Sequence, residues 1–186
     1  MADPAKRRAT YEDLLAVPRP LLAEIIHGEL VTHPRPATLH ALAASTLTAE
    51  VVGAFQRGRG GPGGWFIVAE PEIHLGADIL VPDLGGWRRE RMPQYPDTAA
   101  FQLAPDWACE VLSPSTRSWD VTEKRAIYAR EEVRHLWFVD PRARTLEVFR
   151  LEPQGWVVAG SWRDDARVRA EPFDAIELEL GALWSG

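Results

Sequence analysis

One segment of the chain has the residue spacing of an amphipathic α-helix. Its apolar side chains recur at intervals that place them on one helix face: Leu39, Leu42, Ala43, Leu47, Val51 and Phe55. This pattern predicts a helix of about five turns, the clearest helix in the sequence. Pro34 and Pro36 separate it from the segment before it.

Short apolar runs typical of β-strands follow this helix. They occupy residues 65–68, 72–75, 79–84, 107–112, 135–139, 145–151 and 156–162. The last three runs are joined by turn-forming residues and predict an antiparallel meander. A second helix is expected over residues 120–131, where Asp120 and Glu123 have the spacing of a capping box. The chain therefore combines helices and strands.

Two further segments allow more than one interpretation. Residues 22–26 and 29–32 flank His27-Gly28 and predict a β-hairpin, with a helix C-cap at Gly28 as the competing interpretation. Residues 175–184 are compatible with a strand or with a short closing segment.

Length and composition bound the class of protein. The 186 residues suit one domain over 1–186, with the first nine residues disordered. The chain is 46% hydrophobic and 26% charged, as in soluble globular proteins. Apolar runs fall short of the ~20 residues that span a bilayer, and the N-terminus lacks a signal-peptide core. We therefore expect a cytoplasmic protein without a membrane partner. The single cysteine, Cys109, excludes an internal disulfide and suits a buried thiol.

The charges bear on nucleic-acid binding in two ways. A net charge of -6 argues against broad, non-specific binding to a duplex, although a carboxylate-rich metal site would contribute part of it. Of the 21 Lys and Arg residues, only Lys6 and Lys124 are lysine. Because a compact ammonium can do chemistry that a planar guanidinium cannot, Lys124 is a candidate for a functional side chain.

Two strand-like runs contain carboxylates where packing alone would favour apolar side chains. Asp83 follows Ile79-Leu80-Val81-Pro82, and Glu110 lies within Trp107-Ala108-Cys109-Glu110-Val111-Leu112. A buried, ionised carboxylate is costly unless it is paired, protonated or bound to a metal. Either residue alone is more often structural, but neighbouring strands would bring both carboxylates to one end of a sheet, as Mg²⁺ or Mn²⁺ prefers. Lys124 could face them from the following helix, or be an ordinary solvated lysine.

These residues belong to a longer pattern along the chain. It comprises Glu24-Ile25-Ile26-His27-Gly28-Glu29-Leu30, His40, Val81-Pro82-Asp83-Leu84, Glu110 through Thr116, Asp120, Lys124, Tyr128 and His135 through Pro141. The pattern resembles the Uma-two family of restriction-endonuclease-like proteins, in the PD-(D/E)xK nuclease superfamily, over nearly the whole chain. Its most specific part is Glu110 through Thr116 followed by Asp120 and Lys124.

The resemblance implies an α/β (α+β) fold with a restriction-endonuclease-like core. This is a mixed central β-sheet flanked by helices, with an N-terminal hairpin and a C-terminal antiparallel meander. Pro82-Asp83 corresponds to the first half of the superfamily motif and Glu110 to the second. The lysine expected two residues after the glutamate is replaced by Leu112, and the resemblance implies that Lys124 takes its place from the next helix.

The resemblance also implies a reaction, the hydrolysis of nucleic-acid phosphodiester bonds. Mg²⁺ or Mn²⁺ would be held by Asp83, Glu110 and the main chain of Val111, and would activate a water molecule. Lys124 would orient that water and stabilise the developing charge, and Glu24 would hold a metal-bound water or a second ion. Auxiliary roles are expected for His40, Arg117, Asp120 and Arg125. For His40 an ordinary helix histidine is equally compatible, and for the arginines solvated surface side chains are the alternative.

Two other functions stay open at this point. One is a catalytically silent module that keeps the nuclease fold for binding or regulation, which the acidic net charge favours. The other is a small-molecule phosphodiesterase that uses the same site. Nucleic acid is the expected partner, with DNA favoured over RNA. A homodimer is also expected, from the superfamily's habit and from Trp156, Trp162 and Trp184 as candidate exposed aromatics.

Overall fold

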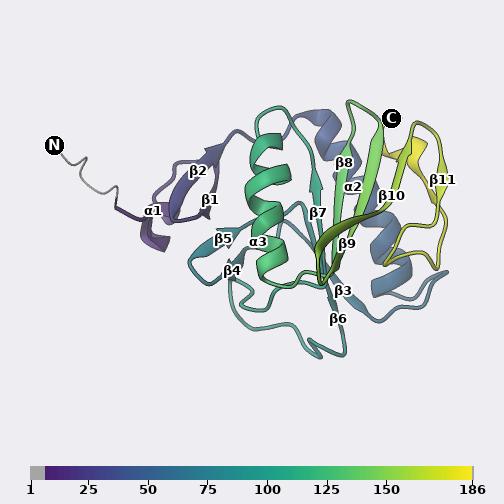
Figure 1. Ribbon diagram of the computed structural model, residues 1–186, viewed down its shortest axis with the longest axis horizontal. Helices are drawn as coiled ribbons and strands as arrows, with labels where there is room; N and C mark the ends of the chain where they lie inside the picture. Colours follow the sequence, from purple (N-terminus) through teal and green to yellow (C-terminus); the bar gives the residue numbers. More distant parts are fainter. Residues whose placement is uncertain (1–6, 186) are drawn as a thin grey trace.

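The computed structural model describes residues 7–185 and is built around a six-stranded mixed β-sheet (Figure 1). Its strand order is β10-β9-β8-β7-β6-β3. The strands are β3 (Trp65–Ala69), β6 (Leu84–Arg88), β7 (Trp107–Val111), β8 (His135–Asp140), β9 (Thr145–Glu152) and β10 (Gly155–Arg163). Within this sheet β7 and β8 pair in parallel, and the other neighbours are antiparallel.

A second, four-stranded sheet lies beside the first, with the order β2-β1-β5-β4 (Figure 1). Its strands are β1 (Leu22–Ile26), β2 (Glu29–His33), β4 (Ile73–Leu75) and β5 (Asp78–Leu80). Helix α1 (Tyr11–Leu15) precedes it, and a small pair, β11 (Arg167–Val168) with β12 (Leu178–Glu179), stands near the C-terminus together with the 3-10 turn η3 (Leu180–Leu183).

Helices cover the large sheet on both faces (Figure 1). Helix α2 (Thr38–Val51) continues into the π-helical turn η1 (Val52–Gln56), and the π-helical segment η2 (Trp119–Lys124) continues into α3 (Arg125–Arg130). Along β7, Trp107, Cys109 and Val111 belong to the core on the α2 side, whereas Ala108 belongs to the core on the α3 side. This alternation places Glu110 on the face that η2 and α3 cover.

The expected mixed sheet flanked by helices, the N-terminal hairpin and the C-terminal meander are confirmed. In the hairpin, Ile26 pairs with Glu29, and His27 and Gly28 both have positive φ, 53° and 80°. A two-residue turn of this kind needs left-handed backbone at both central positions, so the C-cap alternative at Gly28 is wrong. The main-chain N–H of His27 donates to Asp78 (2.6 Å).

The strand expected over residues 79–84 is interrupted. β5 ends at Leu80, and Val81-Pro82-Asp83 carries the chain from the small sheet into β6 of the large one. Proline has no N–H to donate to a sheet ladder, which explains the break at Pro82. Asp83 therefore lies in a connection between the two sheets and not inside a strand.

The capping box expected at Asp120 and Glu123 is also wrong. Asp120 already lies inside the helix, because its N–H donates to the carbonyl of Thr116 (3.0 Å) in the helical pattern. The hydroxyl-rich loop from Ser113 to Thr116 leads into the start of the helix, where the sequence pattern had placed Asp120. The Asp120 side chain is buried and is free to take part in the site.

The tryptophans do not form the exposed surface expected of a dimer interface. Trp184 is buried, and Trp156 and Trp162 are partly buried against the two cores. The aromatic argument for a homodimer is therefore wrong, and the dimer itself stays a prediction. Cys109 is fully buried as expected, and burial raises the pKa of its thiol well above the ordinary value.

The apolar length of α2 is used in packing. By length and composition alone, residues Thr38–Gln56 could cross a membrane. In the structure Ala43, Leu47, Val51 and Phe55 pack in the core against the large sheet. At the N-terminus, disorder was expected for residues 1–9; residues 1–6 lie outside the described range, whereas the N–H of Ala9 donates to the carbonyl of Gly28 (2.8 Å).

Candidate active site

A cavity of about 240 Å³ lies where the two sheets and the start of η2 meet. Its polar lining comes from separate elements of the chain and includes Glu24 and His33 from the hairpin, His40 from α2, Asp83 from the connection before β6, Glu110 from β7, and Ser113, Ser115, Thr116, Asp120 and Lys124 from the loop and η2. Four predicted catalytic residues, far apart in sequence, therefore line one cavity.

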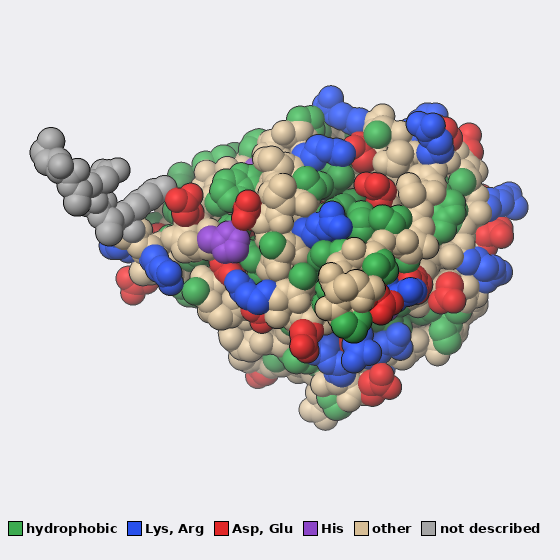
Figure 2. Space-filling model, in the orientation of Figure 1, with side chains coloured by type: hydrophobic (Ala, Val, Ile, Leu, Met, Phe, Trp, Pro, Cys, Tyr) green, Lys and Arg blue, Asp and Glu red, His purple; other side chains and the backbone are tan. Residues whose placement is uncertain are grey.

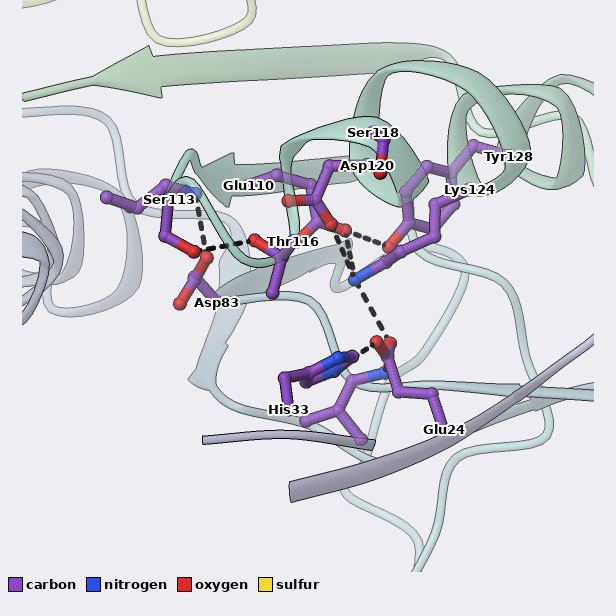
Figure 3. Close-up of polar contacts among 12 residues, drawn as sticks. Glu24, His33, Asp83, Glu110, Ser113, Thr116, Ser118, Asp120, Lys124 and Tyr128 are labelled. Atoms are coloured by element: carbon purple, nitrogen blue, oxygen red, sulfur yellow. Dashed lines mark hydrogen bonds and ion pairs between the residues drawn. The ribbon is translucent and has the colours of Figure 1, made fainter. Parts of the chain in front are cut away.

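Glu110 lies in β7, whereas Asp83 immediately precedes the neighbouring strand β6, so the expectation that both lie in strands is wrong for Asp83. β6 and β7 are antiparallel with Leu84 opposite Cys109, so the next position outward in the register sets Asp83 beside Glu110. Both carboxylates line the cavity (Figure 3). The register of the large sheet is therefore what brings these two acidic residues together.

Two donors fix the carboxylate of Asp83. His40 Nε2 lies 2.6 Å from Asp83 Oδ1, and the main-chain N–H of Val111 donates to Asp83 Oδ2 (2.7 Å). Burial lowers the pKa of His40, but the hydrogen bond and the charge of Asp83 outweigh it, so this pKa lies above its ordinary value. His40 is thus an immediate partner of Asp83.

Glu110 is held by two donors on a single oxygen. Lys124 Nζ lies 2.8 Å from Glu110 Oε1, and the hydroxyl of Tyr128 donates to the same oxygen (2.6 Å) (Figure 3). Glu110 is 2% exposed. Its burial, together with the charges of Asp120, Asp83 and Glu24, raises the pKa of Glu110 well above the ordinary value despite Lys124. The site therefore has more negative charge than Lys124 alone neutralises.

Lys124 is a buried ammonium, 2% exposed, surrounded by carboxylates. Its Nζ lies 3.0 Å from Glu24 Oε1 and 3.5 Å from Asp120 Oδ1, in addition to Glu110 (Figure 3). Burial lowers the pKa of Lys124, but Glu110 and Glu24 outweigh it and hold this pKa well above the ordinary value. The alternative of a solvated helix lysine is wrong.

Glu24 reaches the site from the small sheet. Its Oε1 accepts from the main-chain N–H of Val81 (2.7 Å), and its Oε2 lies 3.0 Å from His33 Nε2. Burial raises the pKa of Glu24, but Lys124, His33 and Val81 together lower it to about 2. Glu24 is therefore an ionised partner of Lys124 and connects the hairpin to η2.

The site contains residues to which the sequence pattern gave no role. His33 holds Glu24, Tyr128 holds Glu110, and the hydroxyls of Ser113 and Thr116 lie 3.0 Å apart at the cavity wall. The sequence contained only one indication of His33 and Tyr128, namely that each is a polar residue in an otherwise apolar segment. His33 ends a strand and Tyr128 lies within a helix. That signal does not specify a partner.

Arg117 and Arg125, expected to grip phosphates, lie elsewhere. Arg117 forms an ion pair with Asp140, and the guanidinium of Arg125 stacks on Phe149, 4.5 Å from the ring centre. Neither lines the cavity, whereas Arg35 does. The two arginines therefore hold the helix to the large sheet.

The donor set of the cavity has the chemistry of a divalent-ion site. Five carboxylates line the cavity together with one lysine, and oxygen donors with excess negative charge suit Mg²⁺ or Mn²⁺. Among residues 7–185, however, no three His, Cys, Asp or Glu side chains are placed to hold one ion. The donors therefore fit such an ion with two carboxylates, and further ligands would come from the main chain or from water.

We expect Lys124→Met to destabilise the fold, contrary to the simple view that a catalytic lysine can be removed without structural cost. Removing one partner of a buried ion pair leaves uncompensated charge and costs about 3–5 kcal/mol. Urea unfolding at neutral pH measures this change. Adding Glu110→Gln to the variant should restore part of the missing stability, because it removes one of the stranded charges. A Lys124→Met protein as stable as the wild type would contradict the ion-pair cluster.

Comparison with known proteins shows the family and the fold of this chain. The crystal structure of a "putative nuclease belonging to DUF820" from Anabaena variabilis ATCC 29413 superposes with a TM-score of 0.75 and 24% identity. The match covers 95% of this chain and 97% of that one. No curated protein matches the chain significantly. The family model of Uma2, described as "Putative restriction endonuclease", matches residues 8–181, and the chain therefore belongs to the Uma2 family.

Proposed function

We propose that this protein is a nuclease that hydrolyses phosphodiester bonds in nucleic acid, DNA in preference to RNA, with the help of Mg²⁺ or Mn²⁺. One observation carries the proposal: the buried ammonium of Lys124 lies between Glu110 and Glu24 in the cavity that Asp83 also lines. A scaffold has no need of such a costly cluster. The family and the fold agree with this function, as an analogy at the level of the fold.

The chain's own residues have distinct roles in this proposal. Lys124 donates to a non-bridging phosphate oxygen or to the attacking water, and stabilises negative charge as it develops. Tyr128 and Lys124 occupy Glu110 Oε1, which leaves Oε2 for the reacting groups. His40 and the Val111 N–H orient Asp83. Glu24 holds the ammonium from the opposite side.

Asp83 and Glu110, with the main-chain carbonyl of Val111, are the proposed ligands of the divalent ion. When bound, such an ion polarises the phosphate and lowers the pKa of its water. The fit rests on the donor chemistry of the two carboxylates and on the excess negative charge of the cavity, which adds to burial in raising the pKa of Glu110.

A binding module without turnover is the second candidate. The net charge of -6 favours it, and so does the lack of three converging side-chain ligands among the described residues. The two candidates differ in a measurable way, because only the nuclease needs Glu110 as a carboxylate.

Glu110→Gln tests catalysis directly. This change keeps the size of the side chain and an acceptor for Tyr128 but removes the charge. We expect the cleavage rate of labelled DNA with Mg²⁺ or Mn²⁺ to fall by a factor on the order of 10² or more. Asp78→Asn is the matched control, because Asp78 is equally buried but pairs with Arg130 outside the cavity. Absence of cleavage by the wild type would leave only the binding module, and equal measurable rates for the wild type and Glu110→Gln would show that Glu110 is not a catalytic residue.

Metal binding has a readout that does not depend on turnover. An ion that binds only the folded state raises its stability, by about 2.7 kcal/mol at one hundred times the dissociation constant. We expect titration with Mn²⁺ to raise the melting temperature of the wild type. Asp83→Asn and Glu110→Gln should abolish this rise, and Asp78→Asn should keep it. A rise that survives in both site variants would place the ion elsewhere.

We also propose a homodimer, which now rests on the superfamily resemblance alone because the tryptophans are buried or partly buried. Sedimentation velocity at micromolar protein should give the mass of two chains. The mass of a single chain at every concentration would exclude the dimer.

A further inference from the structure

A groove continues from the active-site cavity along the end of the large sheet. Its volume is about 530 Å³, and it shares Ala37, His40, Ser113 and Pro114 with the cavity. Its outer part is lined by Pro141, Arg142, Arg144 and Trp184. The wall that the cavity and the groove share thus includes His40, the partner of Asp83.

The outer groove is basic where the cavity is acidic. Arg142 and Arg144 are exposed, and neither guanidinium has a side-chain or ion-pair partner within residues 7–185. Arg35, also exposed, lines the neighbouring cavity. Figure 2 shows basic side chains along the edge of the molecule where Figure 1 places the turn between β8 and β9. Unpaired arginines beside a carboxylate-rich site suit a ligand with several negative charges.

The turn that carries these arginines is held in place. Asp140 Oδ1 accepts from the N–H groups of Arg142 (3.1 Å) and Ala143 (2.9 Å), and Asp140 Oδ2 is paired with Arg117 at the start of the catalytic helix. The N–H of Asp164 donates to the carbonyl of Arg144 (2.8 Å). The turn is therefore fixed relative to the helix that bears Lys124, as a site with a set distance from the reaction centre requires.

The groove also has unpaired buried polar atoms in its lining side chains. Among the described residues, three buried side-chain polar atoms lack a hydrogen-bond partner, and two of them are His40 Nδ1 and Trp184 Nε1. Both side chains line the groove. A buried indole N–H without an acceptor is unfavourable, so these two side chains leave polar groups unsatisfied in the wall of the groove.

We propose that this groove binds the phosphate backbone of a polynucleotide on one side of the scissile bond, with Arg142 and Arg144 contacting successive phosphates. The inference rests on the proposed function and narrows its substrate class. The substrate is then a polymer that extends past the cavity, and a small phosphodiester would use the cavity alone. Backbone contacts carry no sequence preference, so the groove determines position and affinity.

The first test measures binding, so that it does not depend on turnover. Fluorescein-labelled single-stranded and duplex DNA and RNA of the same sequence are titrated with the full-length protein in EDTA, with anisotropy as the readout. The double variant Arg142→Ala/Arg144→Ala should bind the preferred nucleic acid at least tenfold more weakly than the wild type. Its slope of log K against log salt should be smaller by about two, because two phosphates are no longer neutralised by an arginine.

The matched control removes two other exposed arginines. Arg57 and Arg134 also lack side-chain partners within residues 7–185, and both lie outside the groove. Arg57→Ala/Arg134→Ala makes the same change in net charge and should bind like the wild type. Equal weakening in both double variants would show a general charge effect and overturn the proposal. Wild-type affinity in Arg142→Ala/Arg144→Ala, or failure of the wild type to bind any of the nucleic acids, would also overturn it.

A second assay separates this inference from the proposed function. The wild type and both double variants are compared on bis(4-nitrophenyl) phosphate and on the labelled oligonucleotides, with Mn²⁺ present. Arg142→Ala/Arg144→Ala should keep the rate on the small diester and fall at least tenfold in kcat/KM on the oligonucleotide. If neither substrate is hydrolysed, the proposed nuclease function is contradicted. The binding experiment then still tests whether the groove binds a polynucleotide. An equal fall in kcat/KM on both substrates would mean that the arginines act on the reaction centre. That result would overturn the proposal that the groove binds a polynucleotide.

Discussion

The buried ion cluster around Lys124 is the interaction on which the rest of the site depends. One ammonium lies within 3.0 Å of carboxylates from two different sheets, Glu110 of the large sheet and Glu24 of the small one. Taking these charges out of water is costly, and only their mutual attraction and further hydrogen bonds offset the cost. The cluster therefore requires β1, β7 and η2 to stay in fixed positions. It also gives a role to Lys124, one of only two lysines in a chain whose other basic residues are arginines.

The break in the strand at Pro82 determines the position of Asp83. Since the chain leaves the small sheet at Leu80 and enters the large one at Leu84, Asp83 stands at the junction of the two sheets. From there it meets His40 of α2 and the main chain of β7 at once. A continuous strand, as the sequence pattern suggested, would have left this carboxylate on one face only. The junction thus connects α2, the large sheet and the small sheet through one side chain.

Acidic and basic regions adjoin at this end of the molecule, which bears on the net charge of -6. The carboxylates line the cavity, whereas the unpaired arginines line the adjoining groove. Total charge is therefore a poor guide to what the site attracts, because local fields differ in sign over a short distance. Asp140 links the two regions, since it orders the turn with Arg142 and also pairs with Arg117 at the start of the helix that bears Lys124.

The sequence by itself determined the apolar face of α2 and the strands of the meander, and it favoured the hairpin at His27-Gly28 over a helix C-cap, because these follow from local spacing and turn chemistry. Its motif pointed to the carboxylates of Glu24, Asp83, Glu110 and Asp120 that line the cavity. It did not determine the end of β5 at Leu80 or the position of Asp120 within its helix, since pairing and hydrogen bonding with distant segments decide both. Only the tertiary structure showed that Arg117 pairs with Asp140, that Arg125 stacks on Phe149, and that His33 and Tyr128 belong to the site. A charged or polar side chain takes its partner from whichever segment the fold places beside it, and local sequence carries no record of that neighbour.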